Sequence, residues 1–163
     1  MKALLLAGAI AAGALPPAKL DAEIASVIDL FYDLEFEKAS IAADRLAGNY
    51  PGHPAGAFYR SIVHYQRFLA EEPKRKETLE AFEKHCDDAL DAAERLRRED
   101  PAQGHYYLGI AKGFRARVLA AQKRYFKAIP EGLSAVRQLK KALAIDPNIE
   151  DAYLGLGMYH YIT

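Results

Sequence analysis

The chain has little cysteine, no excess of either charge, and no N-terminal apolar run long enough to cross a bilayer. Its one cysteine, Cys86, excludes an internal disulfide. Lys and Arg number 22, as do Asp and Glu, so the chain as a whole has no bulk attraction to nucleic acid or to an anionic membrane. The uncharged run over residues 3–15 is 13 residues long, whereas a spanning helix needs roughly 20. No stable membrane span is therefore expected.

The composition that is present predicts a folded domain. Of the 163 residues, 51% are hydrophobic and 27% are charged, which is typical of one globular domain rather than a disordered chain. The charge is unevenly distributed. Residues 1–100 hold 13 basic and 18 acidic side chains (13 − 18 = −5), and residues 101–163 hold 9 and 4 (9 − 4 = +5). This charge asymmetry has two interpretations. It is either a chance distribution over the surface, or it marks an elongated molecule suited to an acidic partner or to head-to-tail contacts.

Residues 1–18 have the pattern of a secretory signal peptide. Lys2 precedes the uncharged run, and the small residues at Ala14 or Ala18 offer a cleavage site. No cysteine follows the run, so a lipid anchor is not indicated. We therefore expect an exported bacterial protein, periplasmic or secreted, whose mature domain covers residues 19–163. The alternative is an apolar N-terminal helix of a cytosolic protein.

The rest of the chain predicts helices and no strands. Apolar residues recur at i, i+3, i+4 and i+7, and Gly and Pro fall mainly between these segments. Pro130 is expected in the first turn of its helix, where a missing N–H costs little. The glycines Gly109 and Gly113, four residues apart, are expected to allow close helix packing. The expected helices are 21–33, 37–48, 54–70, 76–99, 104–124, 129–145 and 149–162.

The ends of three of these helices share one spacing. Small residues on one face let a neighbouring helix approach, a larger apolar residue fills the remaining gap, and proline ends the helix. The three instances are Ala39-x3-Ala43-x2-Leu46-x4-Pro51, Ala89-x3-Ala93-x2-Leu96-x4-Pro101 and Ala135-x3-Leu139-x2-Ala142-x4-Pro147. The helices that follow Pro101 and Pro147 also match each other, as Tyr107-x2-Ile110-Ala111-x2-Phe114 and Tyr153-x2-Leu156-Gly157-x2-His160.

These two patterns together, with the segments DAYLGLG and KKALAIDP, resemble the tetratricopeptide repeat over residues 21–163. The closing prolines are 50 and 46 residues apart (101 − 51 and 147 − 101), against about 34 in the standard unit. The resemblance implies an all-α, right-handed solenoid of antiparallel helical hairpins, with about three hairpins and one unpaired C-terminal helix. With the export signal, the chain is similar to exported bacterial proteins of this family.

No pattern of residues indicates catalysis, a metal site or a cofactor. None of the five histidines lies in HExxH or in a zinc-type cluster, and no Gly-rich phosphate loop or G-x-S-x-G stands out. In the segment EKHCDD, His85 points away from the face that Glu83 and Asp87 share. Cys86 lies at an apolar helix position and is expected to be a packed thiol. We therefore expect a protein that is not an enzyme.

Binding is the function that the resemblance implies. In the family, the first helix of each hairpin lines a concave face that holds a peptide or a partner helix. Carried over to this chain, the candidates are Tyr65, His105, Lys112 and Arg115, with Tyr161 extending the surface. The basic stretch around them favours an acidic protein or peptide over nucleic acid, which an exported protein seldom meets. A plain solvated helix face is the other reading.

The C-terminal segment predicts a helix that lacks part of its cover. Tyr153, Leu156, Gly157 and His160 are expected to dock on helix 129–145, which leaves Leu154, Met158, Tyr161 and Ile162 uncovered. Either the chain is a fragment, or a partner or a second copy covers this face. The leading hypothesis is a non-catalytic scaffold of the cell envelope. The alternative is the N-terminal repeat region of a longer protein whose activity lies beyond residue 163.

Overall fold

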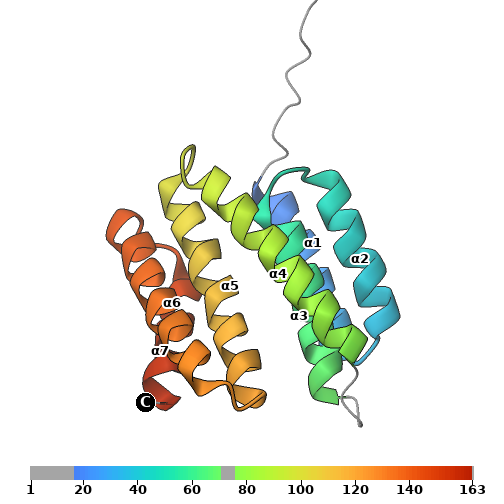
Figure 1. Cartoon of the computed structure of the whole chain (residues 1–163). Coiled ribbons are helices and arrows are strands. Elements are labelled where there is room, and N and C mark those ends of the chain that lie inside the picture. The colour runs from blue at the N-terminus through green and yellow to red at the C-terminus, as the bar shows by residue number, and fades with distance from the viewer. Residues whose placement is uncertain (1–16, 71–75, 163) are drawn as a thin grey trace, which may run out of the picture.

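The computed structural model describes residues 17–70 and 76–162, with side chains for residues 19–70 and 76–158. Within these ranges the chain forms seven α-helices and no strand (Figure 1). The predicted all-α class is thus confirmed. Residues 1–16, most of the predicted signal peptide, lie outside the described residues. The helices are α1 (Pro17–Tyr32), α2 (Phe36–Asn49), α3 (Pro54–Ala70), α4 (Lys76–Leu96), α5 (Pro101–Ala121), α6 (Tyr125–Ile145) and α7 (Glu150–Ile162).

Three of the helices begin at a proline. Pro17, Pro54 and Pro101 each occupy the first helical position, where the absent N–H would have no partner within the helix. At α5 the carboxylate of Asp100 accepts a hydrogen bond from the Gln103 N–H at 3.1 Å, which caps the helix. The helices α1 and α5 therefore begin before the predicted residues 21 and 104, because these prolines start a helix as well as ending the preceding segment.

The α1–α2 and α5–α6 connections are the same type of turn. Leu34 and Lys123 both adopt a left-handed backbone, with φ of 62° and 60°. In the first turn the Glu35 N–H bonds back to the Leu30 carbonyl at 2.9 Å, and an equivalent 2.9 Å bond closes the second. This is the Schellman arrangement, which usually has glycine at the left-handed position. Both turns therefore hold a side chain in a conformation that favours glycine.

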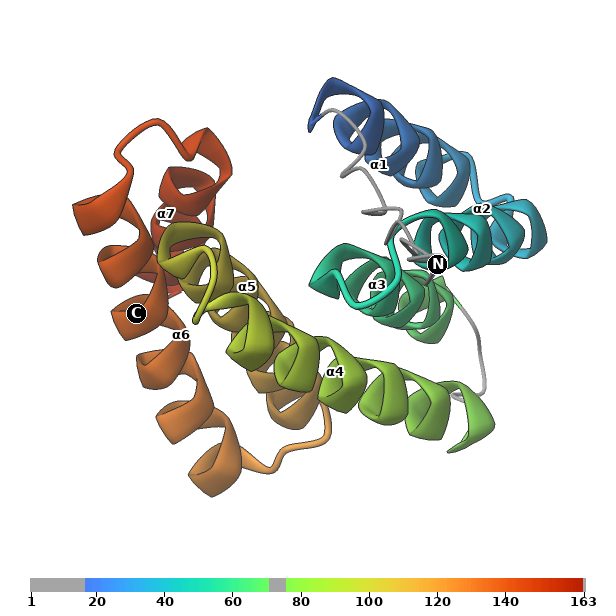
Figure 2. The same ribbon diagram turned by 90° about the horizontal axis from the view of Figure 1, so that it is seen from above.

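The helices form two sets that differ in their neighbours. Each helix packs on the next along the chain, and α1, α3, α5 and α7 also contact one another in series. No two of α2, α4 and α6 are in contact in the part of the chain that the structure describes. Figure 2 shows the odd-numbered helices along the inner side of a curved row and the even-numbered ones outside it. We call these sets the inner and the outer helices.

The repeated small-residue positions lie inside the interfaces between these helices. In the first two repeats, the four alanines are buried, as is the larger Leu46; the alanines are Ala39, Ala43, Ala89 and Ala93. The third repeat is buried at Ala135, Leu139 and Ala142. The predicted packing role of the spacing is therefore confirmed. Small side chains at these positions allow helix axes to approach, and the larger residue restores packing density.

Glycines mark the closest helix contacts. A Cβ added to Gly109 would lie 2.6 Å from Leu139, which confirms the close packing predicted there, whereas one on Gly113 would meet only Ala135 at 3.8 Å. The tightest contact was not predicted. A Cβ on Gly104 would lie 2.3 Å from the Arg97 Cα, because α5 crosses the end of α4 backbone to backbone. Gly56 meets Ala47 in the same way at the α2–α3 junction.

Two predictions about helix placement are wrong. Helix α6 begins at Tyr125, four residues before the predicted start, so Pro130 lies in the second turn and not the first. Helix α7 docks through Ala152, which is fully buried, and Gly155, and not through Tyr153, which is 53% exposed. The helix is rotated about its axis relative to the prediction, and a Cβ added to Gly157 would have no neighbour within 4 Å.

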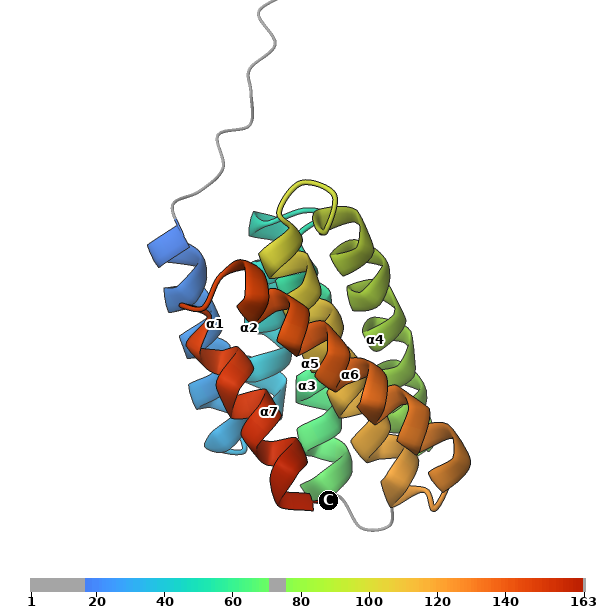
Figure 3. The same cartoon turned by 90° about the vertical axis from the view of Figure 1, so that its left-hand side faces the viewer.

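The remaining face of α7 is exposed as the sequence predicted. Leu154 and Met158 are both accessible to solvent, while Leu156 is partly buried against the core. Figure 3 shows α7 lying against α5 and α6. The side chains of His160, Tyr161 and Ile162 lie outside the described residues. Among the described helices, none has the length and hydrophobicity required to span a membrane.

A candidate binding face on the inner helices

Side chains from three of the inner helices meet on the inner side of the row, and a carboxylate of the fourth lies within electrostatic range of them. Tyr59 comes from α3, and Tyr106 and Tyr107 come from α5. The hydroxyl of Tyr106 lies 3.4 Å from a carboxylate oxygen of Asp151 on α7. The carboxylate of Asp21 on α1 is close enough to affect the pKa of both Tyr59 and Tyr107. We call the three tyrosines the inner tyrosine cluster, and Asp21 and Asp151 flank it.

Aromatic packing between α3 and α5 fixes the cluster. The ring of Phe58, next to Tyr59, meets Tyr107 at 6.2 Å and Phe114 at 5.8 Å, both edge to face. The Tyr107 ring also packs edge to face on Tyr106, at 5.1 Å between centroids. Such pairs contribute roughly 0.5–1.5 kcal/mol beyond the area they bury. The rings are therefore held on both sides, and their positions do not depend on a bound partner.

His53 fixes the other side of the Tyr107 ring. The two rings lie 5.3 Å apart at an interplanar angle of 87°. The His53 Nδ1 accepts a hydrogen bond from the backbone N–H of Ala55 at 3.2 Å, in the first turn of α3. A ring nitrogen that accepts carries no proton, so this contact requires the neutral imidazole. Burial lowers the pKa of His53, against an opposing effect of Asp100, which agrees with a neutral ring.

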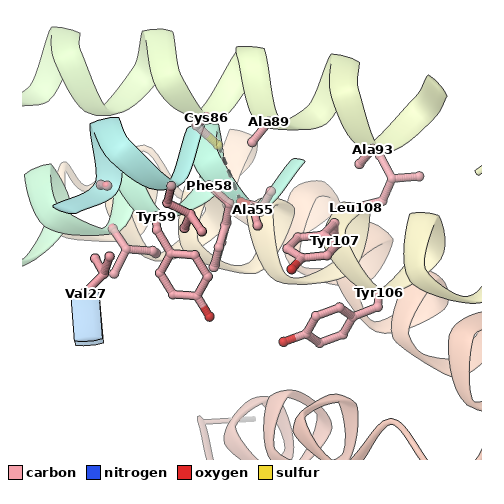
Figure 4. Close-up of a cluster of buried hydrophobic side chains, with 14 of the residues drawn as sticks. Val27, Ala55, Phe58, Tyr59, Cys86, Ala89, Ala93, Tyr106, Tyr107 and Leu108 are labelled. Carbon is pink, nitrogen blue, oxygen red and sulfur yellow. Dashed lines mark hydrogen bonds between the residues drawn. The ribbon is translucent and has the colours of Figure 1, made fainter. Parts of the chain in front are cut away.

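The tyrosine rings are buried while their hydroxyls lie together. Tyr59 and Tyr106 are each 9% exposed, and Tyr107 is 5% exposed. Figure 4 shows the three hydroxyl oxygens pointing into the same space between α3 and α5. Within the described residues, neither Tyr59 nor Tyr107 uses its hydroxyl in a hydrogen bond. Neither oxygen is among the buried side-chain atoms that lack a partner, so both hydroxyls reach solvent at the edge of otherwise buried rings and are available to a ligand on the inner face.

The electrostatics of the cluster keep the phenols protonated. Burial raises the pKa of Tyr59, and the carboxylates of Asp151 and Asp21 raise it further. Burial and the neighbouring Tyr59 and Asp151 raise the pKa of Tyr106 in the same direction. Each hydroxyl therefore remains an O–H group that can both donate and accept at neutral pH. The two flanking carboxylates are exposed, and neither pairs with a Lys or Arg among the described residues.

The structure does not bring the sequence-predicted binding residues together. Tyr65 is half-buried and packs against the rings of Phe82 and Phe114. His105 is buried, and its Nδ1 lies 2.6 Å from the Gln138 side-chain oxygen. The side chain of Tyr161 lies outside the described residues. Tyr65 and His105 therefore belong to different helix interfaces.

The other two predicted residues, Lys112 and Arg115, line a separate hollow on the outer side. It lies between α4, α5 and α6 and has a volume of about 640 Å³. Lys112 approaches Glu131 at 3.5 Å, and Arg115 forms an ion pair with Asp87. On α5, Arg115 lies nine residues after Tyr106, which at about 100° per residue places the two on opposite sides of the helix. Because carboxylates neutralise both cations, this hollow offers little net positive charge.

The basic stretch predicted from the sequence is divided between these two sides. Arg117 packs over the ring of Phe114 at 5.2 Å, and its guanidinium reaches the sulfur of Met158 at 3.4 Å. It lies eleven residues after Tyr106, or about 16 Å further along α5. Arg124 and Lys127 instead line the outer hollow, beside the fully exposed ring of Phe126. The sequence stretch therefore does not make one continuous basic surface.

The described residues contain no group of three or more His, Cys, Asp or Glu side chains that could hold a metal ion. Cys86 is buried, and its thiol lies 3.6 Å from the Ala111 carbonyl. Burial raises the pKa of Cys86 to about 11, although the nearby Arg115 opposes this. The thiol is therefore protonated at neutral pH and packs as a small apolar side chain, as predicted.

The repeat pattern alone does not identify the inner tyrosine cluster. It marks Tyr107 as a packing residue but not Tyr59 or Tyr106, because tyrosine at a helix position does not reveal which neighbour it faces. Comparison of the chain with protein-family models, with curated proteins and with solved structures gave no match. The geometry of the inner face is therefore what points to its function.

Proposed function

We propose that this protein is a non-catalytic interaction scaffold that binds a segment of a protein or peptide across its inner face. The observation that carries the proposal is the meeting of groups from α3, α5 and α7 at one place, within electrostatic range of Asp21 on α1, with two accessible hydroxyls that no described residue satisfies. A surface built from several successive helices suits an extended ligand, because each helix contributes one contact along its length.

The proposal includes the finer architecture that the sequence suggests. Three antiparallel helical hairpins, α1–α2, α3–α4 and α5–α6, would form a right-handed solenoid of tetratricopeptide type, followed by α7 without a partner helix. The contacts in series among the inner helices and the buried small residues at matching positions support this reading. The export signal expected in residues 1–18 would direct such a scaffold to the bacterial cell envelope.

Site-specific photocrosslinking in the native host tests the proposal. A photoreactive amino acid would replace the exposed Asp21 or Asp151, which flank the inner tyrosine cluster from opposite ends of the row. The matched control position is Ile41 on the outer helix α2, which is also exposed. We expect positions 21 and 151 to yield an adduct with the same protein and position 41 to yield none. Adducts from position 41 alone, or none from either inner position, would contradict the proposal.

A further inference from the structure

The inner face carries a charge opposite to that of the basic stretch in the sequence. Asp21 and Asp151 bracket the inner tyrosine cluster, and both carboxylates are exposed and form no ion pair with a described residue. Arg117, which contacts place beside α7, lies about 16 Å further along α5 than Tyr106 and is already stacked on Phe114. A ligand that enters between the tyrosines thus meets negative charge from both sides.

The groups around this space suit a cation in two ways. The carboxylates supply negative charge, and the hydroxyls of Tyr59 and Tyr107 supply unused acceptor oxygens. An acidic side chain would be repelled by both carboxylates, and an apolar one would leave both hydroxyls unsatisfied in a dry contact. A cationic side chain is the chemistry that satisfies all of these groups together.

We propose that the inner tyrosine cluster, with Asp21 and Asp151, is a subsite for a Lys or Arg side chain of an extended peptide segment. This inference rests on the proposed function, because it specifies the chemistry of the segment that the inner face binds. It commits to a basic segment, whereas the sequence alone favoured an acidic one. The change follows from the pairing of Lys112 with Glu131 and of Arg115 with Asp87, which removes the cations on which the acidic choice depended.

Selection from a random peptide library on the full-length chain tests the subsite. We expect the selected peptides to be enriched in Lys or Arg, and to compete with one another for one site. For a selected peptide, the double variant Asp21→Asn/Asp151→Asn should weaken binding about tenfold at low salt, as expected for the loss of two charge contacts at exposed carboxylates. Replacing the basic residue of the peptide with citrulline should weaken binding to the native chain by a similar factor.

A matched control carries the same change of charge elsewhere. Asp91 and Glu99 are exposed and lie on or after the outer helix α4, so Asp91→Asn/Glu99→Gln should leave the affinity within about twofold. The variant Tyr107→Phe, which removes one of the two unused hydroxyls and keeps the ring, gives a second test that does not alter net charge. We expect it to weaken binding of the same peptide while the circular dichroism spectrum is unchanged.

The outcomes that would contradict the cation subsite differ from those that would contradict the proposed function. If peptides bind and are blocked by Asp151→Trp, which places a bulky side chain beside the cluster, but show no basic enrichment, the cation subsite is wrong and the inner-face scaffold stands. If the selected peptides are basic but bind the Asn double variant as tightly as the native chain, the subsite is also wrong. If no peptide binds at the inner face in any form, both the subsite and the proposed function fail.

Discussion

The hydroxyl of Tyr106 on α5 lies 3.4 Å from the carboxylate of Asp151 on α7, and 45 positions separate the two residues in the chain. This contact links the third pair of helices to the last helix across the inner face. It also orients one of the two carboxylates that flank the inner tyrosine cluster. The contact therefore joins the stability of α7 to the geometry of the proposed binding face.

Removing this hydroxyl tests the link. The variant Tyr106→Phe should lower the free energy of unfolding by about 0.5–1 kcal/mol, the lower part of the range for a single hydrogen bond, because 3.4 Å is long for an O–H donor. Urea denaturation followed by circular dichroism gives the measurement. Tyr153→Phe on the exposed side of α7 is the control and should have no effect. Equal effects of both variants would show that the contact does not stabilise the fold.

The close crossing of α4 and α5 predicts that alanine substitution at two glycines of α5 will change the stability of the protein in opposite directions. Gly104→Ala would place a Cβ 2.3 Å from the Arg97 Cα, so the helices must separate, at a cost of about 1–3 kcal/mol. Gly113→Ala meets only Ala135 at 3.8 Å, and it should stabilise by about 0.5–1 kcal/mol through helix propensity. Thermal unfolding of both variants measures the difference. A stable Gly104→Ala protein would mean that the two helices do not approach as described.

The left-handed turn at Lys123 predicts a stabilising substitution. A non-glycine residue at φ 60° is strained, so Lys123→Gly should stabilise the protein by about 1 kcal/mol. The matched control is Ala116→Gly, seven residues earlier in the regular part of α5, which should destabilise by a similar amount. Urea midpoints of the two variants should therefore move in opposite directions. A destabilised Lys123→Gly variant would exclude the Schellman turn between α5 and α6.

The lowered pKa values of two partly buried histidines predict that the folded protein becomes less stable in mild acid. Burial lowers the pKa of His53, and burial together with Arg60 lowers that of His85, although Asp88 and other neighbours act in both directions. The unfolded chain therefore binds more protons than the folded one just below pH 6.5, and stability declines as the pH falls from there. His85 also stacks on His64 at 5.6 Å, where a second positive charge would be unfavourable.

Urea denaturation at pH 7.5 and pH 5 measures this dependence. We expect the native chain to lose stability at the lower pH, and we expect the variant His85→Phe, which keeps an aromatic ring against His64, to lose less. If His85→Phe lost as much stability between pH 7.5 and pH 5 as the native chain does, the loss would come from other groups. A native chain that is more stable at pH 5 would contradict the direction of both pKa shifts.

Local patterns in the sequence predicted the helices and their packing stripes. The spacing of Ala39, Ala43 and Leu46, repeated twice more, marked the buried faces correctly because a helix places residues i, i+4 and i+7 on one side in any context. The same periodicity failed for α7, where Ala152 and Gly155 are buried and Tyr153 is not. The apolar residues of α7 lie all around the helix, so the pattern alone does not select one docked face.

The sequence by itself determined that the chain is helical, where its helices lie, and which small residues let them approach, because these properties depend on neighbours within two turns of the chain. Only the tertiary structure decided which side chains share the inner face. Asp21 and Asp151 are 130 positions apart, and each lies in a helix whose rotation is set by contacts with other helices. The same rotation moved Lys112 and Arg115 to the outer side and paired them with Glu131 and Asp87. The charge that a ligand meets is therefore a property of how the helices are turned against one another, which no local pattern specifies.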